Sequence, residues 1–203
     1  MMTKTDLAAR LRNACAAVIA AEQELTEIDS KFGDADHGLT MSKIARAVTE
    51  AVDQSEGGIQ AMLDDAATAV MSLNGGSAVP LWNTWLDGLQ EEAPEGEEID
   101  VAGLKAIFAK ALEELEDMSG AKVGDKTMMD ALIPASEAVA AYTGDSADEL
   151  FDAAAQAAAQ GAEATKQYVS KFGRAKSYGT KTIGTPDAGA VSMSCFFQGL
   201  ARE

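Results

Sequence analysis

Three aspartates in one glycine-marked turn are the residues of this sequence whose spacing points most directly to chemistry. Asp29, Asp34 and Asp36 stand in the stretch DSKFGDADHG. Three carboxylates converge only where something positive holds them, and Mg²⁺ and Ca²⁺ prefer such oxygen ligands. An EF-hand is excluded, because a loop begun at Asp34 has Ala45 at the position that needs its last carboxylate. Two interpretations remain: a metal site, or a solvated acidic turn in which Asp36 caps the next helix.

Residues beside this turn and at a second glycine-rich break could contact phosphate. His37 is the single histidine of the sequence. Its position suits contact with a phosphate, whereas its hard oxygen neighbours argue against a metal-ligand role, and a structural histidine is the alternative. The second break, Asn74-Gly-Gly-Ser77, can present N–H groups to an anion at a helix start. It lacks the Gly-Lys-Ser/Thr of a Walker A loop, and an ordinary helix break explains it at least as well.

A third break has the sequence GDKTMMD, from Gly124 to Asp130. Lys126 is expected to open a helix there, where the helix dipole disfavours a lysine unless an anion binds. The neighbouring Met128 and Met129 could line an apolar slot for a nucleobase. A capped helix with a buried methionine pair is the alternative.

The stretch from Ala164 to Pro186 is the most unusual in composition. It has no acidic residue and holds five of the 16 cations: Lys166, Lys171, Arg174, Lys176 and Lys181. Such a loop suits a triphosphate, and a solvated basic face is the alternative. Charge links the four breaks. In a filled site, the three aspartates would contribute −3, a nucleoside triphosphate about −4 and two Mg²⁺ ions +4. The site would then keep a net charge of about −3, so cations and helix N-termini are needed nearby.

Net charge excludes two classes of protein. The 203 residues include 16 Lys and Arg against 33 Asp and Glu, a net charge of −17. This charge argues against nucleic-acid binding and against a polybasic membrane anchor. With 47% hydrophobic residues, the chain is not expected to be disordered.

Nothing in the sequence predicts membrane insertion or export. No apolar run approaches the roughly 20 residues of a membrane span. The N-terminus has the pattern of an amphipathic helix and not of a signal peptide. Cys15 and Cys195 lie far apart within expected helices, so we expect reduced thiols and, by default, a cytoplasmic location.

Apolar residues recur at helical spacing between short glycine- or proline-marked breaks, which predicts an all-α chain. Only 5% of residues are aromatic, so small and aliphatic side chains must build the core. We expect one domain over residues 1–203, no convincing strand, and eight helices at about residues 7–29, 39–54, 59–73, 80–93, 101–118, 127–142, 147–168 and 190–200. The breaks with candidate chemistry, residues 29–40, 74–84, 120–130 and 173–192, follow alternate helices. In an antiparallel bundle they therefore meet at one end.

Taken together, these motifs resemble the L subunit, or nucleotide-binding (DhaL, Dak phosphatase-like) domain, of dihydroxyacetone kinases. The resemblance covers nearly the whole chain and rests on the order and spacing of its motifs: Asp29 with GDADHG at 33–38, GGS at 75–77, GDKTMMDAL at 124–132, GRA at 173–175 and DAGA at 187–190. It implies an eight-helix antiparallel up-and-down barrel with the nucleotide–metal site at one end.

The resemblance also implies roles for individual residues. Asp29, Asp34 and Asp36 match the metal-binding aspartates, which hold two Mg²⁺ ions beside ADP or ATP. We expect Lys126 and Arg174 to position phosphate, and no side chain to act as a nucleophile. The positions that match nucleotide contacts are His37, Gly38, Leu39, Thr40, Gly76, Ser77, Ala78, Gly120, Met129, Arg174, Asp187, Ala188 and Gly189.

The activity that the resemblance implies is transfer of a nucleotide phosphate to dihydroxyacetone or a related short ketose held by a separate K subunit. In one branch of the family ATP is the donor. In the other branch, bound ADP is rephosphorylated by a phosphoenolpyruvate-dependent phosphotransferase subunit. A homodimer is left open. Two alternatives remain: a kinase subunit for another ketose or polyol, and a divergent nucleotide-binding regulatory module without turnover.

Departures from the family pattern motivate the regulatory alternative. Ser77-Ala-Val-Pro80 stands where a second hydroxyl residue and a third glycine are usual. Val79 could therefore crowd the phosphates or block a glycine-only conformation. Trp82-Asn-Thr84 and Asp187-Ala-Gly189 also differ from the usual motifs. A purely structural bundle is disfavoured, because it gives no reason for Asp, Gly, Lys and Arg to gather in alternate breaks.

Overall fold

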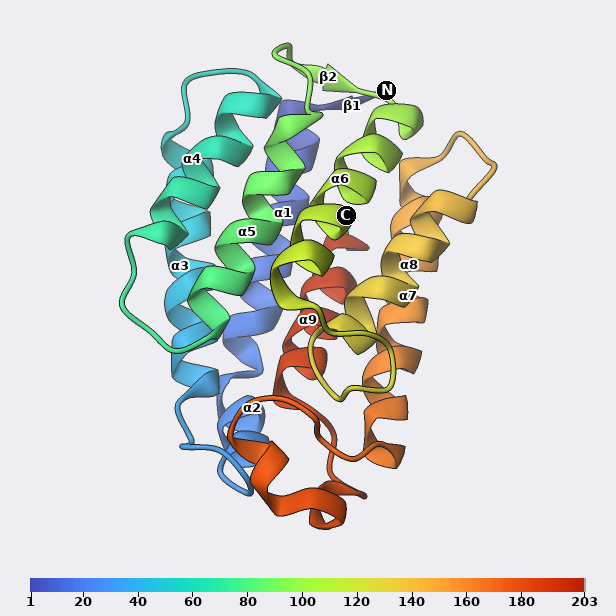
Figure 1. Ribbon diagram of the computed structural model, residues 1–203. Coiled ribbons are helices and arrows are strands. Elements are labelled where there is room, and N and C mark those ends of the chain that lie inside the picture. Colours follow the sequence, from blue (N-terminus) through green and yellow to red (C-terminus); the bar gives the residue numbers. More distant parts are fainter. Residues whose placement is uncertain (203) are drawn as a thin grey trace.

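Helices that run up and down around a common axis make up nearly all of the structure, a computed structural model that describes residues 1–202 (Figure 1). The helices are α1 (Lys4–Ala20), α2 (Glu22–Asp29), α3 (His37–Gln54), α4 (Ile59–Met71), α5 (Ala78–Glu91), α6 (Val101–Ser119), α7 (Met129–Ala141), α8 (Ala147–Ala164) and α9 (Ala188–Leu200). Two 3₁₀ segments, η1 (Thr165–Gln167) and η2 (Arg174–Thr182), and two short strands, β1 (Met2–Thr3) and β2 (Glu98–Ile99), complete the elements of this part of the chain. The prediction of an all-α fold is confirmed.

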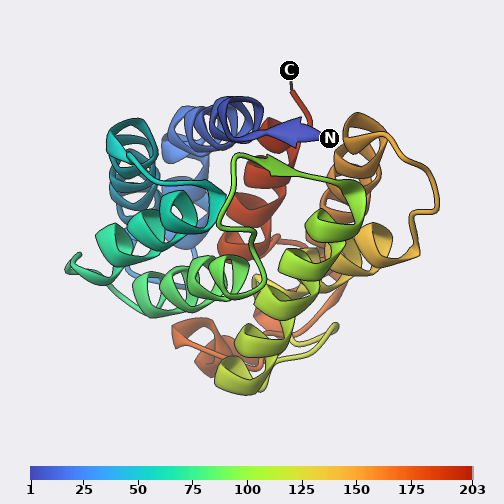
Figure 2. The ribbon, with the colours of Figure 1, turned by 90° about the horizontal axis from the view of Figure 1, so that it is seen from above.

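The barrel is closed by contacts between helices that follow one another along the chain. α1 packs on α3, α3 on α4, and so on to α8 and α9, and α9 returns to α1. Figure 2 looks down on this ring and shows α9 drawn toward its interior. The expected eight-helix barrel is therefore confirmed, with α1 and α2 together in the place of the first expected helix.

Two details differ from the prediction. The first expected helix is broken at Ala21, whose φ of −87° and ψ of 1° separate α1 from α2. Neither proline nor glycine marks this break. Instead, α2 packs on α3 and α9, contacts that the local sequence cannot reveal. The expectation of no strand misses a small antiparallel pair, in which Met2 and Thr3 face Ile99 and Glu98.

The interior is filled by aliphatic side chains and by an aromatic cluster. The ring of Phe196 lies 5.2 Å from Trp82 and 5.4 Å from Trp85, measured between centroids. Helix α9 approaches α1 closely because Gly199 has no side chain, and a Cβ there would lie 2.3 Å from the Cα of Ala14. Closure of the ring therefore depends on small residues at the contact between its last and first helices.

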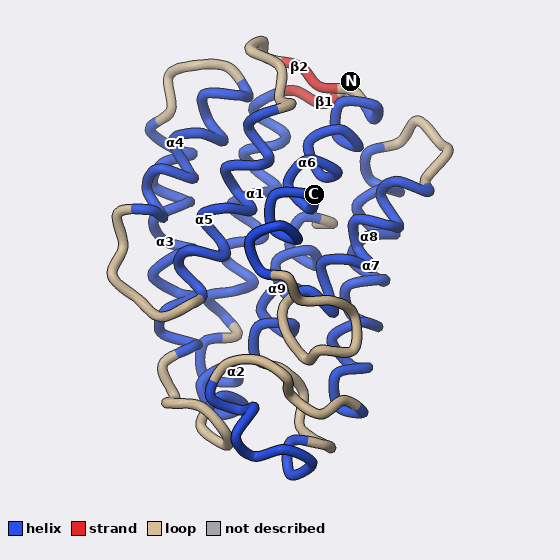
Figure 3. The backbone as a smooth tube through the Cα atoms, in the orientation of Figure 1, coloured by secondary structure: helices blue, strands red, loops and turns tan. Residues whose placement is uncertain are grey.

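The connections divide between the two ends of the barrel (Figure 3). Those that follow α3, α5 and α7 lie at the end that holds β1 and β2, and those that follow α2, α4, α6 and α8 lie at the opposite end. Within residues 1–202, none of the helices combines the length and the apolar character that a membrane crossing requires. Cys15 and Cys195 are both free thiols, as expected.

Candidate functional site

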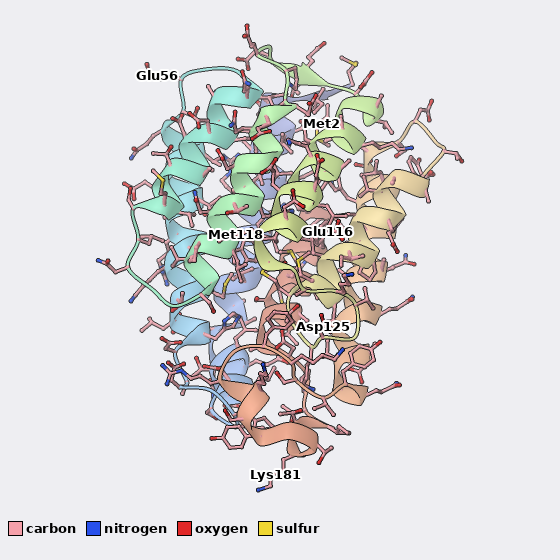
Figure 4. The ribbon with its side chains drawn as sticks, viewed as in Figure 1. Met2, Glu56, Glu116, Met118, Asp125 and Lys181 are labelled. Atoms are coloured by element: carbon pink, nitrogen blue, oxygen red, sulfur yellow. The ribbon has the colours of Figure 1, made fainter. Side chains whose placement is uncertain are left out.

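A pocket of about 380 Å³ opens at the end of the barrel where four connections meet. All four breaks selected from the sequence contribute to its walls, so the expected convergence is confirmed. The lining residues are Ile28, Asp29, Phe32, Gly33, Asp34, Asp36, His37, Thr40, Gly76, Ser77, Ala78, Leu81, Trp82, Lys126, Thr127, Met128, Ser170, Phe172, Gly173, Arg174, Ala175, Pro186, Asp187, Ala188 and Gly189. In Figure 4, Asp125 lies toward this end, whereas Met2 and Glu56 lie at the other.

The three aspartates converge although they come from the end of α2, the following turn and the residue before α3. One carboxylate oxygen from each lies within 4.8 Å of the other two. The turn is tight, since the Gly33 N–H donates to the Asp29 carbonyl over 2.6 Å. A Cβ at Gly33 would lie 1.9 Å from Asp29 Oδ1. Glycine is therefore what lets the chain pass so close to this carboxylate.

Asp29, and not Asp36, binds the N-terminus of α3. Asp29 Oδ2 accepts the N–H of Asp36 over 3.1 Å and that of His37 over 3.4 Å. Asp36 makes no side-chain capping bond, so the interpretation of Asp36 as a cap is wrong. Ala35 adopts a φ of +61°, a left-handed conformation that costs alanine about 1–2 kcal/mol. The turn thus holds its carboxylates under backbone strain, as functional sites often do.

The aspartate oxygens are crowded with negative charge. Burial raises the pKa of Asp36, and the neighbouring Asp34 and Asp29 raise it further. Arg174 opposes this shift, and its Nη2 lies 2.7 Å from Asp34 Oδ2. The Arg174 side chain is 72% exposed, so solvent screens its attraction. The three oxygens lie close enough together to hold a hard divalent cation, whose charge would offset their mutual repulsion.

His37 joins the aspartate turn to the start of α9. Its Nε2 lies 3.1 Å from Ser192 Oγ, which itself donates to the Gly189 carbonyl over 2.9 Å. Burial lowers the pKa of His37, in keeping with a neutral ring. The sequence pattern does not single out Ser192, because its contact joins residues far apart in the chain.

The glycine turn before α5 brings backbone to the pocket wall. Gly76, Ser77 and Ala78 line the pocket, and α5 begins at Ala78. The first turn of a helix carries N–H groups that the helix itself does not use, so it can bind an anion. Val79 lies within α5, is 7% exposed and packs toward Gly75. Val79 has no positive φ and does not line the pocket, so its side chain does not form part of the pocket wall.

Lys126 lines the pocket, but its ammonium is bound by the protein. Nζ donates to the carbonyls of Thr165 over 2.6 Å and Thr185 over 2.5 Å, and the residue is 4% exposed. Lys126 precedes α7 with a φ of +62°, so the expectation that it opens a helix is wrong. Burial lowers the pKa of Lys126, and Asp187 and Asp130 oppose that shift. Two of the three ammonium donors are therefore engaged before any ligand binds.

Asp130 shapes the break in which Lys126 stands. This carboxylate is 1% exposed and accepts the N–H groups of Gly124 over 2.6 Å and Thr127 over 2.7 Å. Such charge-assisted bonds are strong where solvent is excluded. A Cβ at Gly161 would lie 2.0 Å from the Asp130 carbonyl, so α8 packs directly on the start of α7.

Two of the five cations of the basic stretch form ion pairs with residues that do not line the pocket. Lys166 pairs with Glu163 over 2.7 Å, and Lys171 pairs with Asp125 over 2.6 Å. Lys181 projects away from the barrel at its lower tip (Figure 4). The interpretation of a solvated basic face near acidic neighbours therefore describes much of this stretch. Arg174 is the member that lines the pocket.

Asp187 ends the basic stretch and caps α9. Its Oδ2 accepts the Ala190 N–H over 2.8 Å, and its own N–H donates to Thr165 Oγ1 over 2.9 Å. Burial raises the pKa of Asp187 to about 7. The Ala190 hydrogen bond and the charge of Lys126 oppose that shift, and Asp130 adds to it. Asp187 thus changes charge near neutral pH.

Nine of the residues predicted to contact a nucleotide line the pocket: His37, Thr40, Gly76, Ser77, Ala78, Arg174, Asp187, Ala188 and Gly189. Four do not. Gly38 packs on α2, where a Cβ would lie 2.1 Å from the Glu22 carbonyl, and Leu39 is 50% exposed. Gly120 ends α6 with a φ of +62°, and Met129 is 1% exposed in the core.

The sequence did not predict most of the residues that form the apolar walls of the pocket. They are formed by Ile28, Phe32, Leu81, Trp82, Met128 and Phe172. Apolar residues at helical spacing are assigned to the core by default, and of these only Met128 stood in a doublet that indicated a slot. A pocket that combines apolar walls with carboxylates and helix starts suits a ligand with a planar ring and a charged tail.

Known proteins share this fold and are similar to this chain in sequence. The model of the DAK2 domain family matches residues 31–202. The chain belongs to the DAK2 domain family. The resemblance to the L subunits of dihydroxyacetone kinases is thereby confirmed. The L-erythrulose kinase of Pectobacterium atrosepticum is 36% identical to this DAK2 chain over 205 residues, which cover 96% of the chain and 34% of that kinase. The chain thus spans about a third of the length of this relative.

Two other DAK2 comparisons differ in coverage. The ADP-binding subunit DhaL of the PEP-dependent dihydroxyacetone kinase 2 from Listeria innocua is 31% identical, and the match covers 87% of this chain and 84% of that subunit. The crystal structure of the dihydroxyacetone kinase from C. freundii in complex with AMP-PNP and Mg²⁺ has a TM-score of 0.73 at 24% identity. That match covers 96% of this chain and 33% of the kinase chain, and it shows a shared fold.

Proposed function

We propose that this chain is the nucleotide-binding subunit or domain of a kinase that transfers a nucleotide phosphate to dihydroxyacetone or a related short ketose. The convergence of Asp29, Asp34 and Asp36 beside Arg174, in one pocket, is the observation that carries the proposal. The names of the relatives, which are kinases and kinase subunits, support the reaction class. Residues 1–203 act in this proposal as one nucleotide-binding domain.

The donor set of the pocket fits Mg²⁺. The carboxylate oxygens of Asp29, Asp34 and Asp36 are hard ligands, and they lie close enough together to share ions. When bound, Mg²⁺ would supply charge neutralisation at the phosphates. We propose two Mg²⁺ ions, because one ion leaves most of the combined charge of aspartates and phosphates uncompensated.

The remaining pocket residues would orient ADP or ATP. Ala78 begins α5 and lines the pocket, and no side chain caps this helix, so the N–H groups of its first turn suit phosphate oxygens. The Arg174 guanidinium can bind a phosphate in two-pronged geometry. Met128 and Phe172 offer an apolar surface for the nucleobase.

Positioning and charge, rather than a nucleophile, would drive the transfer. Among the described pocket residues, His37 is bonded to Ser192 and Lys126 to two carbonyls, so neither is poised to attack phosphorus. The attacking oxygen would come from the hydroxyl of the substrate. The chain's own groups would hold the phosphate in line with it and stabilise developing charge.

The ketose would be held outside this pocket, by a separate K subunit or by a further part of a longer protein. The chain matches about a third of the L-erythrulose kinase, which supports a division of the two tasks. That relative also makes erythrulose a second candidate substrate. The DhaL subunits from Listeria innocua and Escherichia coli belong to PEP-dependent kinases, which supports a phosphoenolpyruvate-dependent phosphotransferase subunit as the alternative to free ATP.

Calorimetric titration of the purified protein with ADP, with and without Mg²⁺, tests the proposal. We expect Mg²⁺-dependent binding that Asp34→Asn weakens at least about tenfold, because a charged ligand is lost. Asp64→Asn, which removes an exposed carboxylate from α4, is the matched control and should bind like the wild type. Binding without phosphate transfer to dihydroxyacetone or erythrulose, in the presence of a matched K subunit, would favour the regulatory alternative. Absence of Mg²⁺-dependent binding would refute both.

A further inference from the structure

Residues 165–187 form a loop whose two ends lie side by side next to the pocket. The Gly184 N–H donates to the Lys166 carbonyl over 2.7 Å. The Asp187 N–H donates to Thr165 Oγ1 over 2.9 Å. These bonds join the beginning and the end of the loop into a narrow neck. A loop with a closed neck can keep its shape as a unit, as Ω-loops do.

Lys126 binds this neck from outside the loop. Its Nζ donates to the Thr165 carbonyl at one end of the neck and to the Thr185 carbonyl at the other. One buried ammonium therefore joins both ends of the loop to the break before α7. Since charge-assisted bonds are strong in such a position, loss of the ammonium would remove the bonds that join the neck to the break before α7. The contacts of Lys171 with Asp125 would then be the remaining link between the loop and that break.

The backbone at Lys126 indicates that this side chain serves a purpose. A φ of +62° lies in the left-handed region, which glycine and asparagine adopt more readily than lysine. Asp130 accepts the N–H groups of Gly124 and Thr127, on either side of Lys126, and so stabilises this conformation. The hydrogen bonds of the buried ammonium to the two neck carbonyls explain why a lysine stands at this strained position.

The far side of the loop carries the residue that faces the metal-binding carboxylates. Arg174 begins η2 and pairs with Asp34 over 2.7 Å. In the same segment, the ring of Tyr178 lies 5.2 Å from that of Phe32 in the aspartate turn. The η2 segment runs across the lower end of the barrel in Figure 1, below α2 and α9. The placement of Arg174 therefore depends on how the loop is anchored.

We propose that Lys126 is a positioning residue, which clamps the neck of the 165–187 loop and thereby places Arg174 beside the aspartates. The inference rests on the proposed function, in which Arg174 and the aspartates bind the Mg²⁺-nucleotide. It replaces the expected contact between Lys126 and phosphate by an indirect role. The ammonium holds the loop, and the loop presents the guanidinium.

Hydrogen exchange in the nucleotide-free protein tests the clamp directly. Lys126→Gln should accelerate exchange of the amides of residues 165–187 by about tenfold or more and leave α3–α6 unchanged, because only the neck loses bonds. Lys4→Gln is the matched control, since Lys4 Nζ also donates to two carbonyls, those of Ser55 and Gly57, at the opposite end of the barrel. Unchanged exchange of the loop in Lys126→Gln would overturn the proposal.

Nucleotide binding distinguishes positioning from direct contact. In the wild type, Arg174→Ala should weaken Mg²⁺-dependent ADP binding about tenfold. In the Lys126→Gln background it should weaken binding less than about twofold, because the loop no longer presents Arg174. Equal losses in both backgrounds would mean that Lys126 acts independently of the loop and would overturn the proposal.

Two controls keep these outcomes separable. If Lys126→Gln does not fold, exchange is measured in Lys126→Met, whose apolar side chain has a similar length but carries no donor. Acceleration confined to the loop then supports the clamp, and its absence overturns it. If the wild type binds no ADP, the proposed function fails, and the exchange experiment still decides whether Lys126 holds the loop.

Discussion

Replacement of Asp36 by asparagine should stabilise the metal-free protein and remove its response to Mg²⁺. One oxygen of Asp36 lies within 4.8 Å of oxygens of both Asp29 and Asp34. The amide keeps the size and shape of the carboxylate but removes one of three like charges. The raised pKa of Asp36, due first to burial and then to these neighbours, indicates that its charge is disfavoured in the folded state.

The expected gain in stability is small but measurable. Two unit charges 4.8 Å apart repel by about 0.9 kcal/mol in a medium like water. Two such pairs give about 2 kcal/mol. Because the aspartates are largely exposed, salt reduces this further, and we expect the free energy of unfolding of Asp36→Asn to rise by about 1 kcal/mol in EDTA.

Urea unfolding followed by circular dichroism, in EDTA and in Mg²⁺, measures both effects. Mg²⁺ should stabilise the wild type, since an ion that binds the folded state favours it, and should barely affect Asp36→Asn. Asp64→Asn removes the same charge outside the pocket and should lie within about 0.5 kcal/mol of the wild type in EDTA. A decrease in the unfolding free energy of Asp36→Asn in EDTA would refute the idea that the turn holds its carboxylates against repulsion.

Three other substitutions test the aspartate turn, the closure of the ring and the carboxylate that caps α9. Gly33→Ala places a Cβ 1.9 Å from Asp29 Oδ1 and should lower the free energy of unfolding by about 1–3 kcal/mol in the same urea assay. Gly96→Ala is the control: there is open space around Gly96, so the free energy of unfolding should change by less than about 0.5 kcal/mol. Gly199→Ala should cost about 1–3 kcal/mol or more, seen as a lower melting temperature, because its Cβ meets the backbone of α1 and not a flexible side chain. The pKa of about 7 at Asp187 means that the folded state keeps a proton that the unfolded chain releases above about pH 4, so stability falls as pH rises toward 7. Relative to Asp187→Asn, the wild type should lose up to about 3 kcal/mol between pH 5 and pH 8, and parallel pH profiles of the two proteins would contradict this.

Short-range information was enough to predict the elements and the outline of the site. Asp29, Asp34 and Asp36 lie within one turn, so their spacing allowed convergence as one of two interpretations, and the structure brings their oxygens together. Helical spacing of apolar residues and glycine-marked breaks placed alternate connections at one end of the barrel. The pocket is lined from those connections. In these cases the interacting residues are near neighbours, or the antiparallel order of helices dictates their arrangement.

Contacts between distant parts of the chain account for what could not be predicted. From the helix dipole we predicted that an anionic ligand explains the lysine at position 126. Its partners are instead carbonyls 39 and 59 residues further along the chain. His37 is bonded to Ser192, 155 residues away. The break at Ala21 has no local signal, since alanine favours helix and the bend follows from packing of α2 on α3 and α9. Each of these features depends on the assembled fold.

The pairing of Arg174 with Asp34 links the two halves of the proposed site. A divalent cation on Asp34 competes with the guanidinium for the carboxylate, and a bound phosphate offers Arg174 another partner. Metal and nucleotide should therefore favour each other's binding, and to the same extent, because such coupling is reciprocal. The net charge of −17 opposes a nucleotide only over distances that salt screens. Within the pocket, the balance among three carboxylates, one guanidinium, the bound ions and the phosphates decides whether the nucleotide stays.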